Sequence, residues 1–276
     1  MSTLVDEARV AANEAAHRLG VQVLELSEVD DQRAAAELLQ RVWDADSPDQ
    51  LVNASFMRAF SHSGNYVVGA YRGGHLLGAA VAFLGTDHLH SHIAGVEPGR
   101  QGSGVGYAIK LHQRAWALDR GLSTVCWTYD PLVRRNAYFN LCKLGAVATE
   151  YLPDFYGPMD VGTNAGTPSD RMYVRWELTS PSANAAARGE CQEVDPAGGV
   201  VVLGRDEDGA PMPVAEAGGR RLLVAAPADV EALRCTDPSL AVRWRYALRE
   251  AACAALERGY RVAGVTRDGW YVLEDS

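Results

Sequence analysis

His90-Ser91-His92-Ile93-Ala94-Gly95-Val96-Glu97-Pro98-Gly99-Arg100-Gln101-Gly102-Ser103-Gly104-Val105-Gly106 is the most informative segment of the chain. A strand pattern passes there through a glycine-rich turn directly into a helix pattern. Glycines let backbone amides approach a ligand without a Cβ in the way. The start of a helix leaves amide donors unpaired and carries a partial positive charge. Together these features predict a pyrophosphate site, with Arg100 as a neighbouring cation.

Three nucleotide-binding motifs compete for this turn. A Walker loop requires Lys followed by Ser or Thr after the glycines, and that pair is missing. A Rossmann turn fails in both registers, because Tyr107 and Ile109 occupy the third glycine position. The run from Gln101 to Gly106 fits the pattern Gln/Arg-x-x-Gly-x-Gly/Ala without a gap. For these six residues alone, a glycine-rich turn without a ligand is the alternative.

Hydrophobic periodicity on both sides of the turn predicts an α/β (α+β mixed) fold. Arg72-Gly73-Gly74 is typical of a hairpin turn, and Ser47 is a candidate helix cap. Antiparallel hairpins followed by βαβ units indicate a mixed central β-sheet flanked by helices. The expected strands are 21–26, 66–71, 75–83, 88–96, 124–129, 146–151 and 172–178, and the expected helices are 30–43, 104–120 and 132–144.

The composition changes after this region. Residues 179–199 are rich in Ser, Ala, Gly, Asn and Pro, which is typical of a linker between a first domain, 1–178, and a small α/β C-terminal extension, 200–276. Within the extension, Asp237-Pro238 predicts the start of a helix that Gly259 ends. So short a segment makes a weak independent core, so we expect it to pack on the first domain.

Over residues 21–178 the chain resembles the GNAT superfamily of N-acetyltransferases, in a bacterial branch with a C-terminal extension. The resemblance rests on Val96-x-Pro98 before the glycine turn, on Asn136-Ala137-Tyr138-Phe139 and on Lys143-Leu144-Gly145-Ala146. It implies the GNAT fold and direct transfer of an acetyl, succinyl or other short acyl group from a CoA thioester to the primary amine of a small molecule. Amino acids are one acceptor class, since relatives of this branch are associated with N-succinylation of amino acids.

The resemblance also implies which residues hold the acyl-CoA co-substrate. The loop amides would bind the pyrophosphate, and a strand that splays from its neighbour would bind the pantetheine arm through its backbone. By position, the CoA-binding residues are Ala94, Val96, Arg100, Gln101, Gly102, Ser103, Gly104, Val105, Gly106, Asn136 and Phe139.

Three alternating histidines supply candidates for a general base. His88, His90 and His92 point to one face of a strand, and imidazole has a pKa suited to deprotonating an amine. His92 is the first candidate and His90 the second, because paired histidines at these positions are implicated as bases in the serotonin-acetylating branch of GNAT enzymes. Ordinary surface histidines are the alternative.

The general acid departs from the family pattern. The usual tyrosine, two residues before the Lys-x-Gly pair, is Leu141 in this chain. Tyr138 lies at i−3 on the same predicted helix and is the substitute candidate. A packed aromatic without a chemical role is the alternative for Tyr138.

The acceptor site is expected around a long loop, 153–170. Its candidate residues are Tyr129, Asp130, Phe155, Tyr156 and Arg171. Arg134 and Arg171 could each pair with a substrate carboxylate, and Arg245 and Arg249 on a later helix carry the same ambiguity between ligand binding and a solvated surface.

Charge and composition argue against several classes of partner and of site. The net charge of −9 argues against nucleic-acid and anionic-membrane partners. The sequence has no apolar run of membrane length and no signal-peptide core, so a cytoplasmic location is expected. Five widely spaced cysteines without a CxxC pair predict free thiols and no metal. The oligomeric state stays open, a homodimer included.

Two other functions remain open at this point. A CoA-binding regulatory module without catalysis is favoured by Leu141 in place of the tyrosine. An acyl-CoA decarboxylase or hydrolase on the same scaffold is the third hypothesis.

Overall fold

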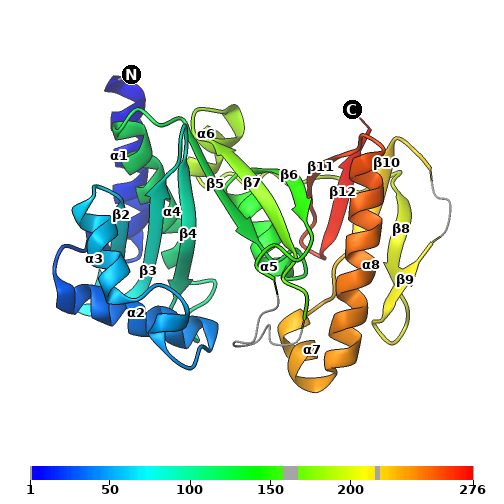
Figure 1. Ribbon diagram of the computed structural model, residues 1–276. Coiled ribbons are helices and arrows are strands. Elements are labelled where there is room, and N and C mark those ends of the chain that lie inside the picture. The colour runs from blue at the N-terminus through cyan, green and yellow to red at the C-terminus, as the bar shows by residue number, and fades with distance from the viewer. Residues whose placement is uncertain (1, 158–166, 215–217, 276) are drawn as a thin grey trace. The chain divides into compact units, whose positions relative to one another are not determined.

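The computed structural model describes residues 2–157, 167–214 and 218–275, which form two compact units (Figure 1). Unit 1 comprises Met1–Trp127 and Glu177–Ser180, and unit 2 comprises Thr128–Trp176 and Pro181–Ser276. This division differs from the predicted boundary at residue 178, because residues 128–176 group with the C-terminal segment.

A mixed seven-stranded sheet has the order β1-β2-β3-β4-β5-β7-β6. The pairs β1–β2, β2–β3, β3–β4 and β6–β7 are antiparallel, whereas β4–β5 is parallel. The expected mixed sheet is therefore confirmed. Its strands are β1 (Gln22–Glu25), β2 (Tyr66–Arg72), β3 (His75–Leu84), β4 (Leu89–Val96), β5 (Thr124–Tyr129), β6 (Val147–Leu152) and β7 (Arg171–Glu177).

Helices cover both faces of β3 and β4 in unit 1. A Cβ on Gly95 of β4 would meet Leu39 and Val42 of α2 (Val29–Trp43), whereas a Cβ on Gly78 of β3 would meet α4 (Val105–Asp119). Leu39 belongs to the apolar core that α2 shares with the sheet. Helix α1 (Ser2–Arg18), which the sequence analysis did not predict, packs against α4.

Helix α3 (Ala54–His62) begins at a different cap from the one predicted. Ser47 precedes the short 3₁₀ helix η1 (Pro48–Gln50) and makes no side-chain cap bond. The Asn53 side chain instead accepts a hydrogen bond from the Phe56 amide at 3.0 Å. Asn and Ser are equally good caps, so the choice between them is set by where the chain turns.

Unit 2 contains a second, five-stranded sheet of order β11-β12-β10-β8-β9. Asp237 caps the long helix α8 through the Leu240 amide, as predicted. The elements are β8 (Val200–Arg205), β9 (Pro211–Pro213), β10 (Arg221–Ala225), α7 (Val230–Thr236), α8 (Pro238–Glu257), β11 (Arg261–Val265) and β12 (Trp270–Glu274).

Two segments of unit 2 differ from expectation. The predicted linker contains helix α6 (Pro181–Ala187), whose Ala183 and Ala186 are buried. The predicted helix 132–144 is instead the short α5 (Arg134–Ala137) followed by the π-helix η2 (Tyr138–Lys143). A π-helix changes the spacing of residues around the axis, so the i−3 argument that related Tyr138 to Leu141 does not apply.

The cysteines correct another expectation. Cys142 and Cys191 form a disulfide, so the five thiols are not all free. Within residues 2–157, 167–214 and 218–275, no helix combines the length and the apolar character needed to cross a membrane.

Candidate functional site

The glycine-rich turn lies at the surface of unit 1 and leads into α4. Residues 98–103 are all exposed. Gly102 has φ 81° and Gly104, the N-cap of α4, has φ 93°, a left-handed conformation that residues with a Cβ rarely adopt. The Gln101 side chain accepts a hydrogen bond from the Gly99 amide at 2.9 Å and so braces the turn. Because residues 98–103 are exposed, a ligand can reach their backbone, whereas the Leu19 side chain lies beside Gly104.

Several amides of this turn remain available to a ligand. The first backbone bond of α4 runs from the Ala108 amide to the Gly104 carbonyl. In the part of the chain that the structure describes, the amides of Gly102, Gly104, Val105 and Gly106 have no hydrogen-bond acceptor. A row of unpaired donors at a helix start favours the binding of an anion.

Arg100 is engaged with a carboxylate at the end of β4. Its Nε donates to Glu97 at 2.8 Å, and His75 Nε2 lies 2.9 Å from the other Glu97 oxygen. The hydrogen bond from Arg100, followed by that from His75, lowers the pKa of Glu97. The Arg100 guanidinium is therefore held next to the turn by its ion pair with Glu97.

Strand β4 carries a bulge at His92. Val81 pairs with Ile93 and Ala82 pairs with Ser91, so His92 is the extra residue in the ladder. A bulge leaves backbone groups outside the regular pairing and re-aims side chains. Ile93 packs in the core with Leu39 and His92 is exposed, because successive side chains of a strand point to opposite faces.

The parallel pairing of β4 with β5 is short. Within the described residues it covers Leu89 with Val125 and His90 with Cys126. β4 continues to Val96. Its second half, which includes Ala94 and Val96, lies beyond the last of these two pairs with β5. The divergence of β4 from β5 that the resemblance implies stays a prediction, and β4 ends at Val96, shortly before the turn.

The three histidines form a row on one side of β4, as predicted. The ring centroids of His88 and His90 are 6.4 Å apart, as are those of His90 and His92, and Phe83 packs against His90 at 4.9 Å. Burial, followed by the neighbouring charges of His92, His88 and Lys110, lowers the pKa of His90 to about 4. Partial desolvation also lowers the pKa of His92, although its side chain keeps access to solvent. Both rings are therefore neutral near pH 7 and can accept a proton.

Lys110 lies inside unit 1, although the sequence analysis did not single it out. Its Nζ donates to Ser91 Oγ at 2.8 Å and to Gln113 Oε1 at 3.0 Å, and it sits 3.9 Å from the ring centroid of Trp127. Burial lowers the pKa of Lys110 to about 7. Lys110 is therefore bonded to Ser91, the residue between His90 and His92 on β4.

The other predicted CoA and acid residues belong to unit 2. Asn136 lies in α5, and Tyr138 and Phe139 lie in η2. The Tyr138 hydroxyl donates to Glu193 at 2.7 Å and accepts from Arg267 at 3.1 Å. The structure thus groups these three residues with each other, whereas the turn and the histidines belong to unit 1. The role of Tyr138 as an acid stays a prediction.

The predicted acceptor residues all lie in unit 2. Phe155 and Tyr156 are exposed and pack edge to face at 4.7 Å, and the Arg171 guanidinium lies 5.1 Å from the Tyr156 ring. Tyr129 is buried, and its hydroxyl lies 3.3 Å from that of Tyr271. The centre of the predicted loop, residues 158–166, lies outside the described residues.

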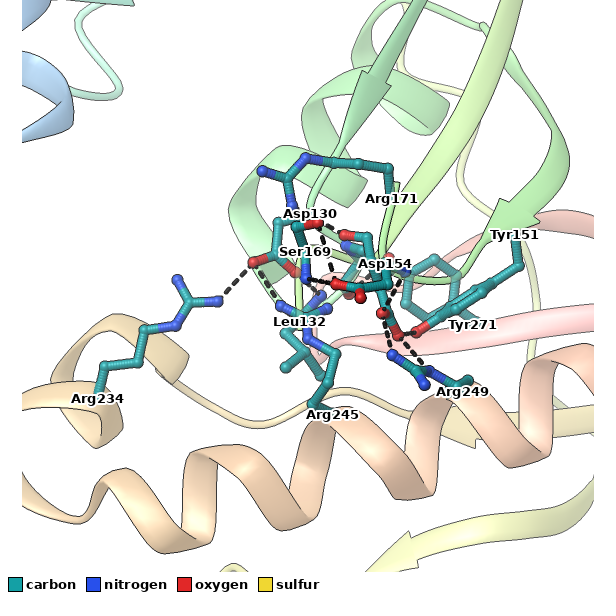
Figure 2. A network of polar contacts seen from close by, with 12 residues as sticks. Asp130, Leu132, Tyr151, Asp154, Ser169, Arg171, Arg234, Arg245, Arg249 and Tyr271 are labelled. Carbon is teal, nitrogen blue, oxygen red and sulfur yellow. Dashed lines mark hydrogen bonds and ion pairs between the residues drawn. The ribbon is translucent and has the colours of Figure 1, made fainter. Parts of the chain in front are cut away.

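Asp130 and Arg171 belong to a buried polar network (Figure 2). We define the arginine cluster as Asp130, Arg171, Arg234 and Arg245. Arg234 from α7 donates to Asp130 Oδ2 at 2.5 Å, and Arg245 from α8 donates to the same oxygen at 2.8 Å. Burial alone would raise the pKa of Asp130, but the charges of Arg245, Arg234 and Arg171 hold that pKa below its usual value.

A second carboxylate completes the network next to the arginine cluster. Asp170 is fully buried, accepts from the Tyr151 hydroxyl at 2.7 Å, and receives both Nε and Nη2 of Arg249 (Figure 2). Arg171 donates to the Asp170 carbonyl at 2.9 Å. Burial would raise the pKa of Asp170, but the bonds from Arg249, the Asp154 amide and Tyr151 lower it.

Arg234 was missed by the sequence analysis, and Arg245 was left between two interpretations. Arg234 and Arg245 lie 104 and 115 residues from Asp130 along the chain. One signal was present: Arg245 and Arg249 are spaced four residues apart and face the same side of α8.

Comparison with known proteins yields distant structural similarities. No family model matches the chain, and no protein of curated function matches it. Among solved structures, the ribosomal-protein-S18-alanine N-acetyltransferase of Escherichia coli is 16% identical, with 58% of this chain and 95% of that chain covered and a TM-score of 0.46. An N-acetyltransferase of Staphylococcus aureus is 11% identical over 58% and 99% of the two chains, with a TM-score of 0.48.

A GNAT family acetyltransferase of Elizabethkingia anophelis, solved with acetyl-CoA bound, is 14% identical over 58% and 99% of the two chains, with a TM-score of 0.46. These similarities are too distant to assign a family.

Proposed function

We propose that the protein is a GNAT-type N-acyltransferase that moves a short acyl group from acyl-CoA to the primary amine of a small molecule. The observation that carries this proposal is the turn before α4, exposed over residues 98–103, where the amides of Gly102, Gly104, Val105 and Gly106 have no hydrogen-bond acceptor among the described residues. Those amides would hold the CoA pyrophosphate. Gln101 and Arg100 would support the turn and its positive potential.

The second half of β4 supports the same proposal. It connects the histidine row to the turn, and its register with β5 ends at His90. The backbone at Ala94 and Val96 would bind the pantetheine arm and place the thioester near the bulge at His92. The thioester supplies the electrophilic carbonyl carbon.

His92 would act as the general base, and His90 as its partner or substitute. The amine must lose a proton to attack, and a neutral imidazole accepts that proton directly or through a water. Because His92 keeps access to solvent and sits in the bulge, it is the better placed of the two. Tyr138 is proposed as the acid, and Asn136 and Phe139 as further CoA contacts, on the resemblance alone.

A CoA-binding module without catalysis is the second candidate. Leu141 stands where the family places its tyrosine, and it is buried in η2. The Tyr138 hydroxyl is bonded to Glu193 and Arg267, which would restrain it from donating elsewhere.

Thiol release separates these functions. Purified protein is mixed with acetyl-CoA or succinyl-CoA and a panel of primary amines and amino acids, and free CoA thiol is followed. Release that requires an amine supports the transferase. Tight CoA binding without release supports the module, and release without any amine would assign a hydrolase or decarboxylase.

A further inference from the structure

Two buried arginines of the arginine cluster, Arg234 and Arg245, share the single carboxylate of Asp130. The neighbouring carboxylate of Asp170 is already paired with Arg249 (Figure 2). The side chains of Arg234 and Arg245 are only 7% and 1% exposed, and Arg171 is 6% exposed. Burial lowers the pKa of Arg171, the neighbouring charge of Asp130 raises it, and the charges of Arg245 and Arg234 lower it.

Guanidinium donors in the arginine cluster also lack acceptors. Nε and Nη1 of Arg245 and Nε of Arg234 are buried without a hydrogen-bond partner in the described structure. A buried charged donor without an acceptor costs free energy, and most buried polar groups in folded proteins are satisfied. An ion pair with Asp130 needs only one arginine, so the remaining donors are available to an anionic ligand.

We propose that the arginine cluster is a binding site for the carboxylate group of a small molecule. A carboxylate would supply the missing acceptor oxygens and offset the excess of positive charge. A single negative charge fits better than a dianionic phosphate, because Asp130 lies at the centre of the cluster and would repel a second full charge more strongly. Asp130 and Arg171 were predicted acceptor residues, and Arg234 and Arg245 extend that set.

The source of the carboxylate rests on the proposed transferase function. An amino-acid acceptor carries one carboxylate, and a succinyl group on CoA carries another. Both present the same chemistry to the arginine cluster, so they are distinguished by experiment.

Direct binding tests the site without any CoA chemistry. The full-length protein is titrated with succinate and with a panel of amino acids, and with succinamide as the neutral counterpart, by calorimetry and thermal unfolding. We expect saturable binding of a carboxylate and none of succinamide. Arg171→Met and Arg234→Met should weaken that binding about 10- to 100-fold, the loss that one charge-assisted hydrogen bond produces.

Two features keep this test decisive. Arg234→Met leaves Asp130 its bond from Arg245, so this variant should fold, and circular dichroism checks that it does. Arg188→Met removes an exposed arginine of unit 2 that pairs with Glu190, and it should bind like the wild type. Absence of carboxylate binding to the wild type, or binding that Arg171→Met and Arg234→Met leave unchanged, would overturn the proposal.

Two activity arms then identify the source. With acetyl-CoA, an amino acid is compared with its decarboxylated amine; with one neutral amine, succinyl-CoA is compared with acetyl-CoA. The arm in which Arg171→Met abolishes the preference for the carboxylate contains the natural ligand. Carboxylate binding without transfer in either arm would refute the transferase and leave the arginine cluster as a binding site.

Discussion

His90 and His92 hold their ring centroids 6.4 Å apart on one side of β4, although a bulge at His92 interrupts the pairing with β3. His92 keeps access to solvent while Ile93 enters the core, because successive side chains of a strand point to opposite faces. A base needs an outlet for the proton it takes up, and the exposure of His92 provides one.

Replacing His92 tests its role as the base. His92→Ala should lower kcat/KM about 10²–10⁴-fold, because that is the usual contribution of general-base catalysis. His88→Ala is the matched control: it lies in the same row, its ring bonds Asp87, and the change should leave kcat/KM nearly unaffected. Loss of less than about threefold for His92→Ala would remove the assignment.

The acid sensitivity of folding should reflect His90. Its pKa is about 4 in the folded chain against an ordinary value of 6.5, so above pH 6.5 the ring is neutral in both states. As the pH falls from 6.5 toward 4, the unfolded chain takes up a proton that the folded chain does not, and stability decreases. His90→Gln should lose less stability than the wild type over this interval in urea titrations; equal losses would contradict the assignment.

Lys110 should make folding more stable as the pH rises above neutrality. Its folded pKa is about 7 against an ordinary 10.5, so the unfolded chain binds more protons between these values. Stability should therefore rise from pH 7 to pH 10 by up to about 1.4 kcal/mol per pH unit from this one group. Lys110→Met removes the dependence. The difference between the two urea curves at pH 7 and pH 10 checks it, and parallel behaviour of both proteins would show that Lys110 stays charged when buried.

The cap of α3 offers a matched pair of surface variants. Asn53→Ala removes the acceptor for the Phe56 amide and should lower the free energy of unfolding by about 1 kcal/mol. Ser47→Ala should change it by less than about 0.5 kcal/mol, because Ser47 makes no side-chain cap bond. Chemical denaturation of both variants decides which residue is the cap, and the reverse order of effects would restore Ser47.

The sequence predicted the strands and helices around the turn because each carries a strong local signal. Gly73 and Gly74 mark the β2–β3 hairpin, and Asp237 marks the start of α8. Helices α1 and α6 were not predicted from the sequence. They bury alanines, such as Ala8 and Ala183, and such small side chains give only a weak hydrophobic periodicity.

The features of the candidate sites likewise divide into those with a local sequence signal and those without one. The turn and the histidine row depend on neighbours in sequence, so they could be predicted. The bulge at His92 depends on the register with β3, and the bonds of Arg234 and Arg245 to Asp130 depend on tertiary packing over more than a hundred residues. Neither leaves a local pattern.

The most direct measurement for the central claim is a calorimetric titration of CoA into the wild type and into Ser103→Asp. Ser103 is exposed beside the amides of Gly102 and Gly104, so an aspartate should repel the pyrophosphate and weaken CoA binding about tenfold or more. The same charge favours the helix start, so the melting temperature should stay level or rise. CoA binding that the substitution weakens about tenfold or more without loss of stability is the predicted result, whereas no CoA affinity in the wild type, or equal affinity in both proteins, would contradict the account.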